Sequence, residues 1–314
     1  MSATSSAVAA APRGRLFHNV LFSPLARRGN AAALRRVCGL AGVDGGTVTV
    51  VGVIDEPTRL QRLLHGSGHV ERVLAAEHRA MQQRLDRCTR PVEGCDVTTI
   101  IDMGSPALRL LKRTIAAQHD LLVITSDEDE EDQATIKRLM RKSPCPVWLV
   151  RPSRARAVRV LAAIDPEPDE LGLNQSILDI AAAIAGPENG ELHVANAWEL
   201  FGEATMQSSA FLEIDPETLD EQRREVRVAH EAAVAELVAD RLGEGVEVHV
   251  EAGTATHVIP GLVDREHINV VVMGTVGRSG VSGLVMGNTA EQVIDRLTCS
   301  MVTVKPPGFV SPLE

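Results

Sequence analysis

Hydrophobic residues along this chain follow two arrangements that alternate with each other. In short runs such as 119–125 and 268–274 they are nearly continuous, whereas in stretches such as 60–85 and 219–242 they recur at helical spacing among charged residues. The first arrangement is typical of buried strands and the second of amphipathic helices. Strands separated by helices predict parallel sheets that are covered on both faces. Further helices are predicted over 30–38, 106–118, 173–184, 257–266 and 290–297, and 65–69 interrupts the helix over 60–85.

The pattern of strands occurs twice. Segment 145–152 opens with a cysteine and closes with a basic residue and a proline, and segment 299–306 does the same. Strand signals that match in the same order along both halves indicate an internal repeat. The alignment places Ser23 opposite Asp165. The matched segments are 20–24 with 162–166, 46–50 with 190–194, 97–103 with 246–252, 119–125 with 268–274, and 145–152 with 299–306.

The repeat predicts two domains of ordinary size within the 314 residues, each able to bury its own core. We expect a disordered tail over 1–14, a first domain over 15–154, a second domain over 157–308 and a short tail over 309–314. No apolar run reaches the roughly 18 residues of a membrane span, and the first residues lack the pattern of a secretory signal. Five scattered cysteines without CxxC spacing favour reduced thiols in a cytoplasmic protein.

Charge is shared unevenly between the halves. Residues 1–156 carry 23 Lys and Arg against 16 Asp and Glu, whereas the remainder carries 9 against 26, within a net charge of −10. The opposite net charges of the two halves favour contact between the halves, or binding of an anionic partner by the first half. Ordinary solvated surfaces are the simpler interpretation. Nucleic-acid binding is disfavoured by the net charge and by an aromatic content of 2%, although the basic first half keeps it open.

A glycine-rich segment follows the strand that ends at Met273. Glycines stand at positions 274, 277, 280, 283 and 287, and Asn288 and Thr289 then lead into a helix. In open parallel sheets ligands bind beyond the carboxyl ends of the strands, and glycines let backbone amides approach an anion there. The segment therefore predicts a phosphate site, with a plain turn as the alternative. It is neither a P-loop nor a GxGxxG fingerprint.

The spacing Gly274-x2-Gly277-x9-Gly287, followed by a small polar residue, resembles the ATP-binding signature of the universal stress protein family. The resemblance covers nearly the whole chain, once in each half, and is strongest to the tandem E-type members. It implies two doubly wound domains of the adenine-nucleotide alpha-hydrolase-like fold, each with a five-stranded parallel sheet in order 3-2-1-4-5. It also implies that the final strands, 145–151 and 299–305, pair to form a pseudo-dimer within one chain.

The same resemblance assigns the nucleotide contacts to the second half. It implies a carboxylate from Asp165 near the adenosine, and backbone contacts to the base and phosphates. Asn288 departs from the family, which prefers Ser or Thr there, so the site lacks a hydroxyl suited to a γ-phosphate or its metal. The residues implied in cofactor binding are Ala163, Asp165, Val194, Met273, Gly274, Gly277, Arg278, Gly287, Asn288 and Thr289.

The first half lacks these features. An acidic run over 127–132 replaces the glycine segment, and it would repel a phosphate. Because Ser23 also stands opposite Asp165, we infer that this half has lost ATP binding. A solvated loop explains the run most simply, and a bound divalent cation or another small ligand stays open.

Catalytic patterns are poor, and the sequence predicts neither catalytic residues nor a metal site. His193 and His257 are interpreted as packed or surface residues, and ATP hydrolysis would at most be slow. The leading hypothesis is a stress-response protein that binds ATP, ADP or AMP, with or without Mg²⁺, through its second domain and acts on an unidentified protein partner. The alternatives are a weak Mg-dependent ATPase and a ligand-free structural adaptor. Whole chains could also associate as a homodimer, and no membrane contact is expected.

Overall fold

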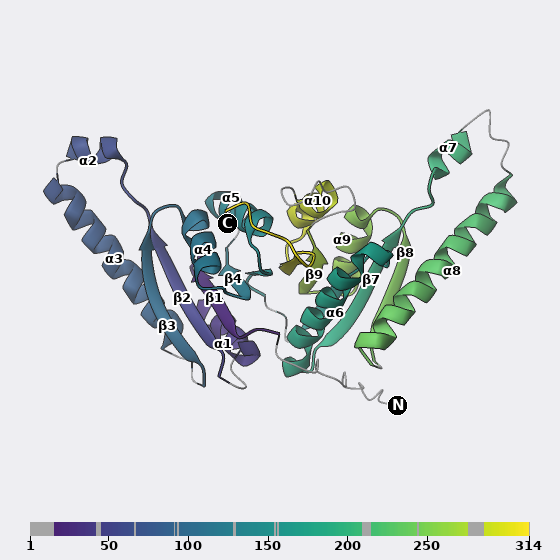
Figure 1. The fold of residues 1–314 in the computed structure, drawn as a ribbon, viewed down its shortest axis with the longest axis horizontal. Coiled ribbons are helices and arrows are strands. Elements are labelled where there is room, and N and C mark those ends of the chain that lie inside the picture. Colours follow the sequence, from purple (N-terminus) through teal and green to yellow (C-terminus); the bar gives the residue numbers. More distant parts are fainter. Residues whose placement is uncertain are drawn as a thin grey trace. The chain divides into compact units, whose positions relative to one another are not determined.

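A computed structural model describes residues 16–41, 45–65, 67–90, 92, 94–127, 130–153, 155, 157–208, 215–243, 245–275 and 286–313. The chain forms two compact units. Of its described residues, the first-repeat unit contains those between 16 and 153 together with 300–313, and the second-repeat unit contains those between 155 and 275 together with 286–299. Figure 1 shows strands alternating with helices in each unit. None of the helices in the described part of the chain is long and apolar enough to cross a membrane.

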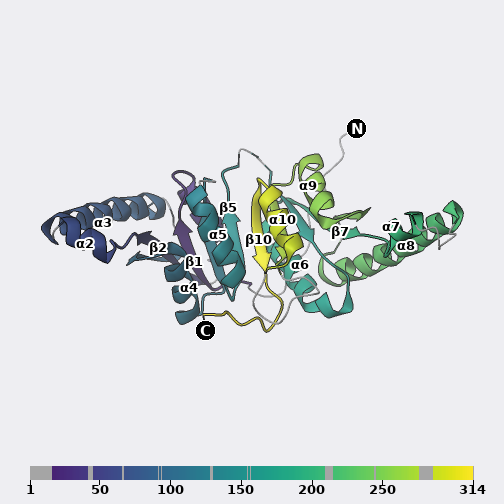
Figure 2. The ribbon, with the colours of Figure 1, turned by 90° about the horizontal axis from the view of Figure 1, so that it is seen from above.

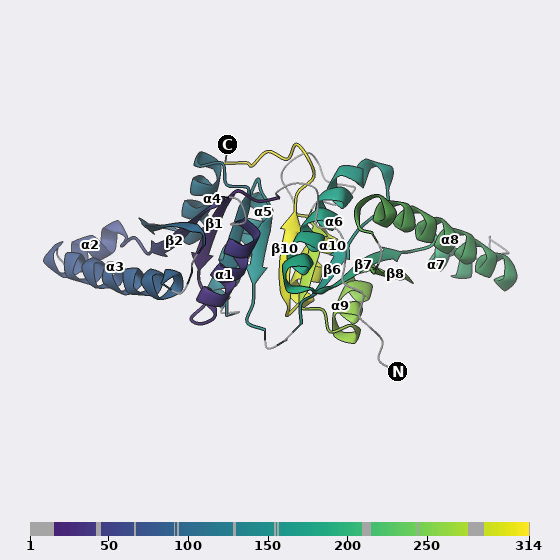
Figure 3. The same ribbon diagram turned by 90° about the horizontal axis from the view of Figure 1, so that it is seen from below.

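The first repeat builds a doubly wound α/β domain, as the pattern predicts. Its five strands lie in the order β3-β2-β1-β4-β5 and pair in parallel. Contacts place α1 and α3 against β1 to β3, whereas α4 contacts β2 and α5 contacts β5 (Figures 2 and 3). The elements are β1 (Asn19–Pro24), α1 (Asn30–Ala41), β2 (Thr47–Ile54), α2 (Arg59–His65), α3 (Ser67–Thr89), β3 (Asp96–Met103), α4 (Pro106–Ala116), β4 (Leu121–Thr125), α5 (Glu130–Lys142) and β5 (Val147–Val150).

The second repeat follows the same plan with four parallel strands in the order β9-β6-β7-β8. Helices α6 and α8 contact each other and the sheet, and α9 contacts both β7 and α10 (Figures 2 and 3). The elements are β6 (Arg159–Ala163), two short 3₁₀ helices (Pro168–Glu170 and Gly186–Glu188), α6 (Leu171–Ala185), β7 (Glu191–Trp198), α7 (Glu203–Ser208), α8 (Pro216–Arg241), β8 (Glu247–Ala252), α9 (Ala255–Arg265), β9 (Val270–Gly274) and α10 (Asn288–Arg296).

The last strand, β10 (Ser300–Val304), pairs with β5 of the first repeat. The pairing is antiparallel, with Val302 opposite Trp148, and it confirms the expected pairing of the two final strands. Every residue of β10 is buried, and Trp148 is 1% exposed. The compact unit of the first repeat therefore includes a strand that belongs to the second repeat in sequence.

Lys305, directly after β10, is nearly buried. Its Nζ atom lies 4.8 Å from the centre of the Phe309 ring and has no hydrogen-bond partner in the described part of the chain. Because burial disfavours a charged ammonium group, the pKa of Lys305 falls to about 8. The cation is held by its packing and by the face of one aromatic ring.

The strand ladders fix how the two repeats correspond. Val20 of β1 pairs with Leu121 of β4, and Val160 of β6 pairs with Val270 of β9. Leu121 and Val270 occupy matched positions in the aligned runs 119–125 and 268–274. Val20 is therefore the structural equivalent of Val160.

The expected match of Ser23 with Asp165 is wrong. Counting onward from the paired strands, Ser23 corresponds to Ala163, and Leu25 corresponds to Asp165. The error comes from matching Pro24 with Pro166. Pro24 is the last residue of β1, whereas Pro166 follows the end of β6 by three residues, so the two prolines are not equivalent.

The two long stretches with helical spacing form helices, as predicted. The interruption predicted over 65–69 falls where α2 ends and α3 begins, and the stretch 219–242 corresponds to α8. The acidic run over 127–132 is not simply a loop, since α5 begins at Glu130. Acidic residues in a first helical turn are favoured by the helix dipole, which explains why the run can start a helix.

Candidate functional site

A pocket of about 900 Å³ lies in the second-repeat unit, beyond the carboxyl ends of β6, β7 and β9. This is the place where open parallel sheets bind their ligands. Most residues predicted from the glycine signature are brought together on its walls. They are Ala163, Asp165, Met273, Gly274, Gly287, Asn288 and Thr289.

Three predicted residues do not line the described pocket. Val194 is fully buried within β7, and its neighbour Ala195 lines the pocket. Gly277 and Arg278 lie outside the described residues. The structure therefore describes both ends of the glycine segment and nothing of its middle.

The backbone of Asp165 is fixed from both sides by one buried side chain. Its N–H donates to Oδ1 of Asn174 at 3.1 Å, and Nδ2 of Asn174 donates to its carbonyl oxygen at 2.5 Å. Asn174 is 1% exposed and lies on α6, which packs against β6 and β9. These two hydrogen bonds tie the loop after β6 to α6, with Asp165 on the pocket wall.

Gly274 ends β9 at a point where α6 comes close. A Cβ atom added at this position would lie 2.8 Å from Cδ2 of Leu173, which also lines the pocket. Any larger residue would have to push Leu173 aside or occupy the pocket itself. The glycine therefore keeps the volume between β9 and α6 open.

The N-terminus of α10 forms another wall. Gly287 is its N-cap residue and provides no side-chain cap, and the first helical hydrogen bond runs from the Glu291 N–H to the Gly287 carbonyl at 3.0 Å. Gly287 itself is tied to the end of β9, because its N–H donates to the carbonyl of Thr275 at 2.9 Å. The amides of a first helical turn carry partial positive charge, so this wall suits an anionic group.

An aromatic wall was missed by sequence reasoning. Trp198 and His230 both line the pocket, and their rings lie 6.0 Å apart at 23° to each other. Asn196 Nδ2 donates to the carbonyl of Ile164 at 3.2 Å, while its Oδ1 atom lies 2.9 Å from Nδ1 of His230. Nδ1 of His230 is therefore the donor of that bond. These residues come from β7 and α8, far apart in sequence, and no local motif joins them.

The described walls of the pocket carry negative charge. Asp165, Glu167, Glu170 and Glu199 line it, and none of its described lining residues is Lys or Arg. Each carboxylate disfavours a further anion close by, since the field of one charge acts over several ångströms. Among the described residues, the amides at the start of α10 are the feature best suited to a phosphate.

The equivalent place in the first repeat is organised differently. Leu25 stands where the second repeat has Asp165, and its carbonyl accepts a hydrogen bond from the Arg84 guanidinium. Arg84 also donates to the carbonyl of Ala26 at 2.5 Å, and burial lowers the pKa of this arginine. The Ala26 N–H donates to the Thr125 carbonyl at 3.0 Å. The loop after β1 is thus bonded to α3 and to the end of β4.

Residues of the acidic run also form hydrogen bonds in this region. Asp127 accepts the N–H of Arg27 at 2.5 Å, and Asp132 accepts the hydroxyl of Ser126 at 3.2 Å. Two carboxylates of the run are therefore used in bonds within the protein. This explains a structural use for acidic residues at a position where the second repeat has glycines.

Each repeat is a doubly wound α/β domain, and one of them carries a ligand-sized pocket at the carboxyl ends of its strands. The model of the universal stress protein family matches residues 27–151 and again residues 158–305. The chain belongs to this family and contains two of its domains in tandem.

Known relatives agree with the tandem arrangement. Universal stress protein E of Salmonella typhi is 31% identical over 216 residues, which covers 65% of this chain and 67% of the relative. Universal stress protein E of Escherichia coli K12 is 30% identical over 221 residues, covering 67% of this chain and 68% of the relative.

Solved structures share the fold across both repeats. A functionally unknown protein from Pseudomonas aeruginosa PAO1 aligns with a TM-score of 0.62 and 25% identity, covering 93% of this chain and 94% of that one. A universal stress protein from Archaeoglobus fulgidus aligns with a TM-score of 0.59 and 19% identity, covering 92% of this chain and 98% of that one.

Proposed function

We propose that this protein binds one adenine nucleotide in the pocket of its second repeat and works as a nucleotide-responsive regulator or adaptor in the stress response. One observation carries the proposal. The pocket places a carboxylate on a fixed loop, Asp165, and the N-terminus of α10 on walls of the same cavity. A carboxylate can accept hydrogen bonds from a ribose or base, and a helix N-terminus can hold a phosphate.

The dimensions and walls of the pocket suit a nucleoside. A volume of about 900 Å³ lies in the upper part of the range for small-molecule sites. Trp198, His230 and Ala197 form a partly apolar side of the pocket, and Gly274 leaves room next to Leu173. In this arrangement the phosphates lie towards Gly274 and Gly287 and the nucleoside lies towards the aromatic wall.

The residue that follows Gly287 bears on how many phosphates are bound. Asn288 offers an amide where the family pattern has a hydroxyl suited to a γ-phosphate or its metal. We therefore expect AMP and ADP to bind at least as tightly as ATP when Mg²⁺ is absent.

Isothermal titration calorimetry with AMP, ADP and ATP, each with and without Mg²⁺, tests the proposal. We expect one site per chain. Asp165→Asn should weaken binding about tenfold or more, because hydrogen bonds to a charged group contribute about 1.5–3 kcal/mol. Gly274→Val should abolish binding by filling the space beside Leu173. Asp169→Asn is the matched control, because Asp169 is exposed on the neighbouring 3₁₀ helix.

The outcomes separate the alternatives. No binding by the wild type overturns the proposal and favours a ligand-free adaptor. Two sites per chain contradict the inference that the first repeat has lost ATP binding. Equal affinity of Asp165→Asn and Asp169→Asn would place the nucleotide elsewhere.

A further inference from the structure

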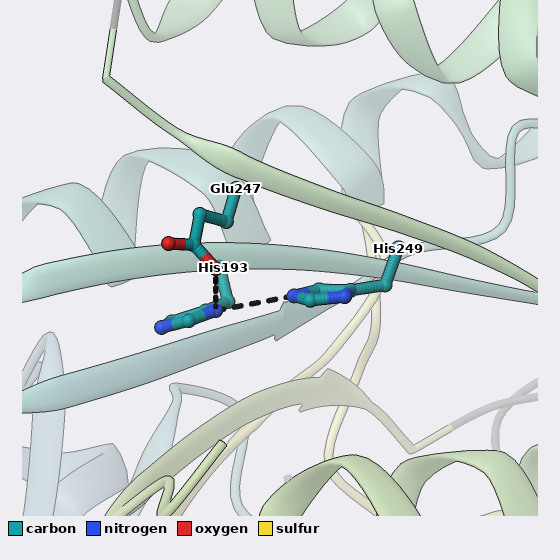
Figure 4. Close-up of side chains that lie close together, drawn as sticks. All are labelled: His193, Glu247 and His249. Carbon is teal, nitrogen blue, oxygen red and sulfur yellow. Dashed lines mark hydrogen bonds and ion pairs between the residues drawn. The ribbon is translucent and has the colours of Figure 1, made fainter. Parts of the chain in front are cut away.

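Three potential metal ligands meet on the sheet of the second repeat. They are His193 of β7 and Glu247 and His249 of β8, shown together in Figure 4. None of them lines the pocket described above. His193 precedes the pocket residue Ala195 by two positions, so the cluster lies towards the beginning of β7.

The register of the parallel strands brings these residues together. His193 stands opposite Glu247, and Ala195 stands opposite His249. Side chains two positions apart on a strand share one face of the sheet, so Glu247 and His249 both face the side of His193. A shift of β8 by one residue would move both ligands to the other face.

The donor atoms converge on Nδ1 of His193. This atom lies 3.1 Å from Nε2 of His249 and 3.5 Å from an Oε2 oxygen of Glu247 (Figure 4). All three donor atoms lie within 4.8 Å of one another. An ion about 2.0–2.1 Å from each donor requires pairs no more than about 4.2 Å apart, and the two pairs that include His193 satisfy this limit. The third pair, Glu247 with His249, lies within 4.8 Å, so the exposed carboxylate of Glu247 has to turn slightly towards the imidazoles for all three to bind one ion.

The two distances from His193 imply angles compatible with tetrahedral coordination. With bonds of about 2.05 Å, the two nitrogens subtend about 98° at an ion, and the nitrogen and oxygen subtend about 117°. These values bracket the tetrahedral angle. Glu247 is exposed, so its carboxylate can turn towards the imidazoles without disturbing the core.

Burial differs among the three ligands in a way that suits a bound ion. The side chain of His193 is 3% exposed, whereas that of Glu247 is 68% exposed. The buried imidazole gives the site a fixed point, and the exposed side leaves positions for water. Zinc sites with three protein ligands keep such an open position.

Two further carboxylates act on the buried imidazole of His193. Nε2 of His193 has no hydrogen-bond partner in the described structure and lies 3.9 Å from Oε2 of Glu191. Metal-bound histidines commonly direct their second nitrogen at a carboxylate. Glu191 and Glu266 both act electrostatically on His193, although they also interact with Arg159 and Arg265 respectively.

We propose that His193, Glu247 and His249 form a binding site for a divalent transition-metal ion of the Zn²⁺ type. Two imidazoles and one carboxylate are ligands that zinc accepts, and they do not suit Mg²⁺ or Ca²⁺, which take oxygen ligands. The ion joins β7 to β8 from one face of the sheet. This proposal is independent of nucleotide binding, because the ligands lie outside the nucleotide pocket.

Zinc titration against a chromophoric chelator tests the site, using protein without a histidine tag from which metal has been removed. We expect one Zn²⁺ per chain in the wild type. His249→Ala and Glu247→Gln should each raise the Kd by about 100-fold or more, since even outer-shell partners of metal ligands contribute about 10–100-fold. His78→Ala is the control, because His78 is exposed on α3 of the other unit. His193→Ala is avoided, because a buried residue in a strand risks misfolding.

Cobalt substitution distinguishes this site from the cysteines. Co²⁺ at the proposed site should give visible d–d bands without the near-ultraviolet charge-transfer band of a thiolate ligand. A thiolate band would overturn the proposal, because Cys95 and Cys299 are partly accessible and would then be the ligands. The proposal also fails if the wild type does not bind Zn²⁺, or if His249→Ala and His78→Ala bind it equally well.

Discussion

Replacing Lys305 by methionine should stabilise the first-repeat unit, and the gain should depend on pH. The ammonium group is buried after β10 and has no described hydrogen-bond partner. Methionine keeps an unbranched side chain of similar length and removes the charge. Burial of the Lys305 charge raises the free energy of the folded state, whereas in the unfolded chain the charge stays hydrated and carries no such cost.

The size of the effect follows from the pKa. The fall of the pKa from 10.5 to about 8 corresponds to about 3 kcal/mol. The Phe309 ring beneath Nζ returns about 0.5–2 kcal/mol through a cation–π contact. We therefore expect Lys305→Met to raise the free energy of unfolding by about 1–3 kcal/mol at pH 7.

The sign of the pH dependence is fixed by where the protons are bound. Between pH 8 and 10.5 the unfolded chain keeps the Lys305 proton, whereas the folded chain has lost it. Wild-type stability therefore rises with pH in this window, by at most about 1.4 kcal/mol per pH unit, and the advantage of the variant shrinks. Burial raises the pKa of Cys88 to about 11 and that of Cys145 to about 12, so both thiols oppose this rise above about pH 9. Both proteins contain the same cysteines, so the contribution of the thiols cancels when the stability of the wild type is subtracted from that of the variant.

Urea denaturation at pH 7, 8, 9 and 10 measures this difference. Lys112→Met is the matched control, since Lys112 is exposed on α4 and its replacement should leave stability unchanged at every pH. The reasoning is refuted if Lys305→Met is destabilising at pH 7, or if its difference from the wild type is the same at pH 7 and pH 10.

Three further predictions concern the pocket, the thiols and a turn. Trp198 lines the pocket, so nucleotide binding should change its fluorescence, and the Trp198→Phe variant should lose this response. The Trp148→Phe variant should keep the response, because Trp148 is buried in the core next to β10. In the native protein at pH 8, a thiol reagent should react quickly with Cys95 and Cys299 alone, because the other three cysteines are buried. After denaturation it should react with all five. Fast reaction of more than two thiols in the native protein would contradict the burial. Gly253→Ala should lower the free energy of unfolding, measured by urea denaturation, by about 1–2 kcal/mol, because Gly253 has φ +131°, a value that residues with a Cβ atom rarely adopt. Gly261→Ala within α9 is the control and should be neutral or stabilising.

The helices and strands were largely predictable because burial leaves a strong periodic pattern. The run 268–274 and the stretch 219–242 each carry that pattern over their full length, and they became β9 and α8. Helix α5 was not predicted, since it begins within an acidic run that contains no hydrophobic residue. A helix start that depends on charge rather than on apolar spacing gives little signal in the sequence.

The candidate site was predictable where the motif is local and unpredictable where the fold assembles it. Gly274 and Asn288 belong to one continuous signature, and the structure places both on the pocket. Trp198 and His230 meet only because α8 packs on β7, and no pattern along the chain relates them. The exact alignment of the two repeats was also not predictable from the sequence. Matching the two prolines displaced the equivalent of Asp165 by two residues, and the strand pairing in the structure corrected it.

The pairing of β10 with β5 has a consequence for synthesis on the ribosome. The chain completes β5 at Val150, but the strand that pairs with it is made only at Ser300–Val304, after almost the whole second repeat. During that interval β5 presents an unpaired edge, which is the kind of surface that recruits strands from other chains. The first-repeat unit can therefore be completed only after the second repeat has been synthesised, and until then the edge of β5 is a potential site of aggregation.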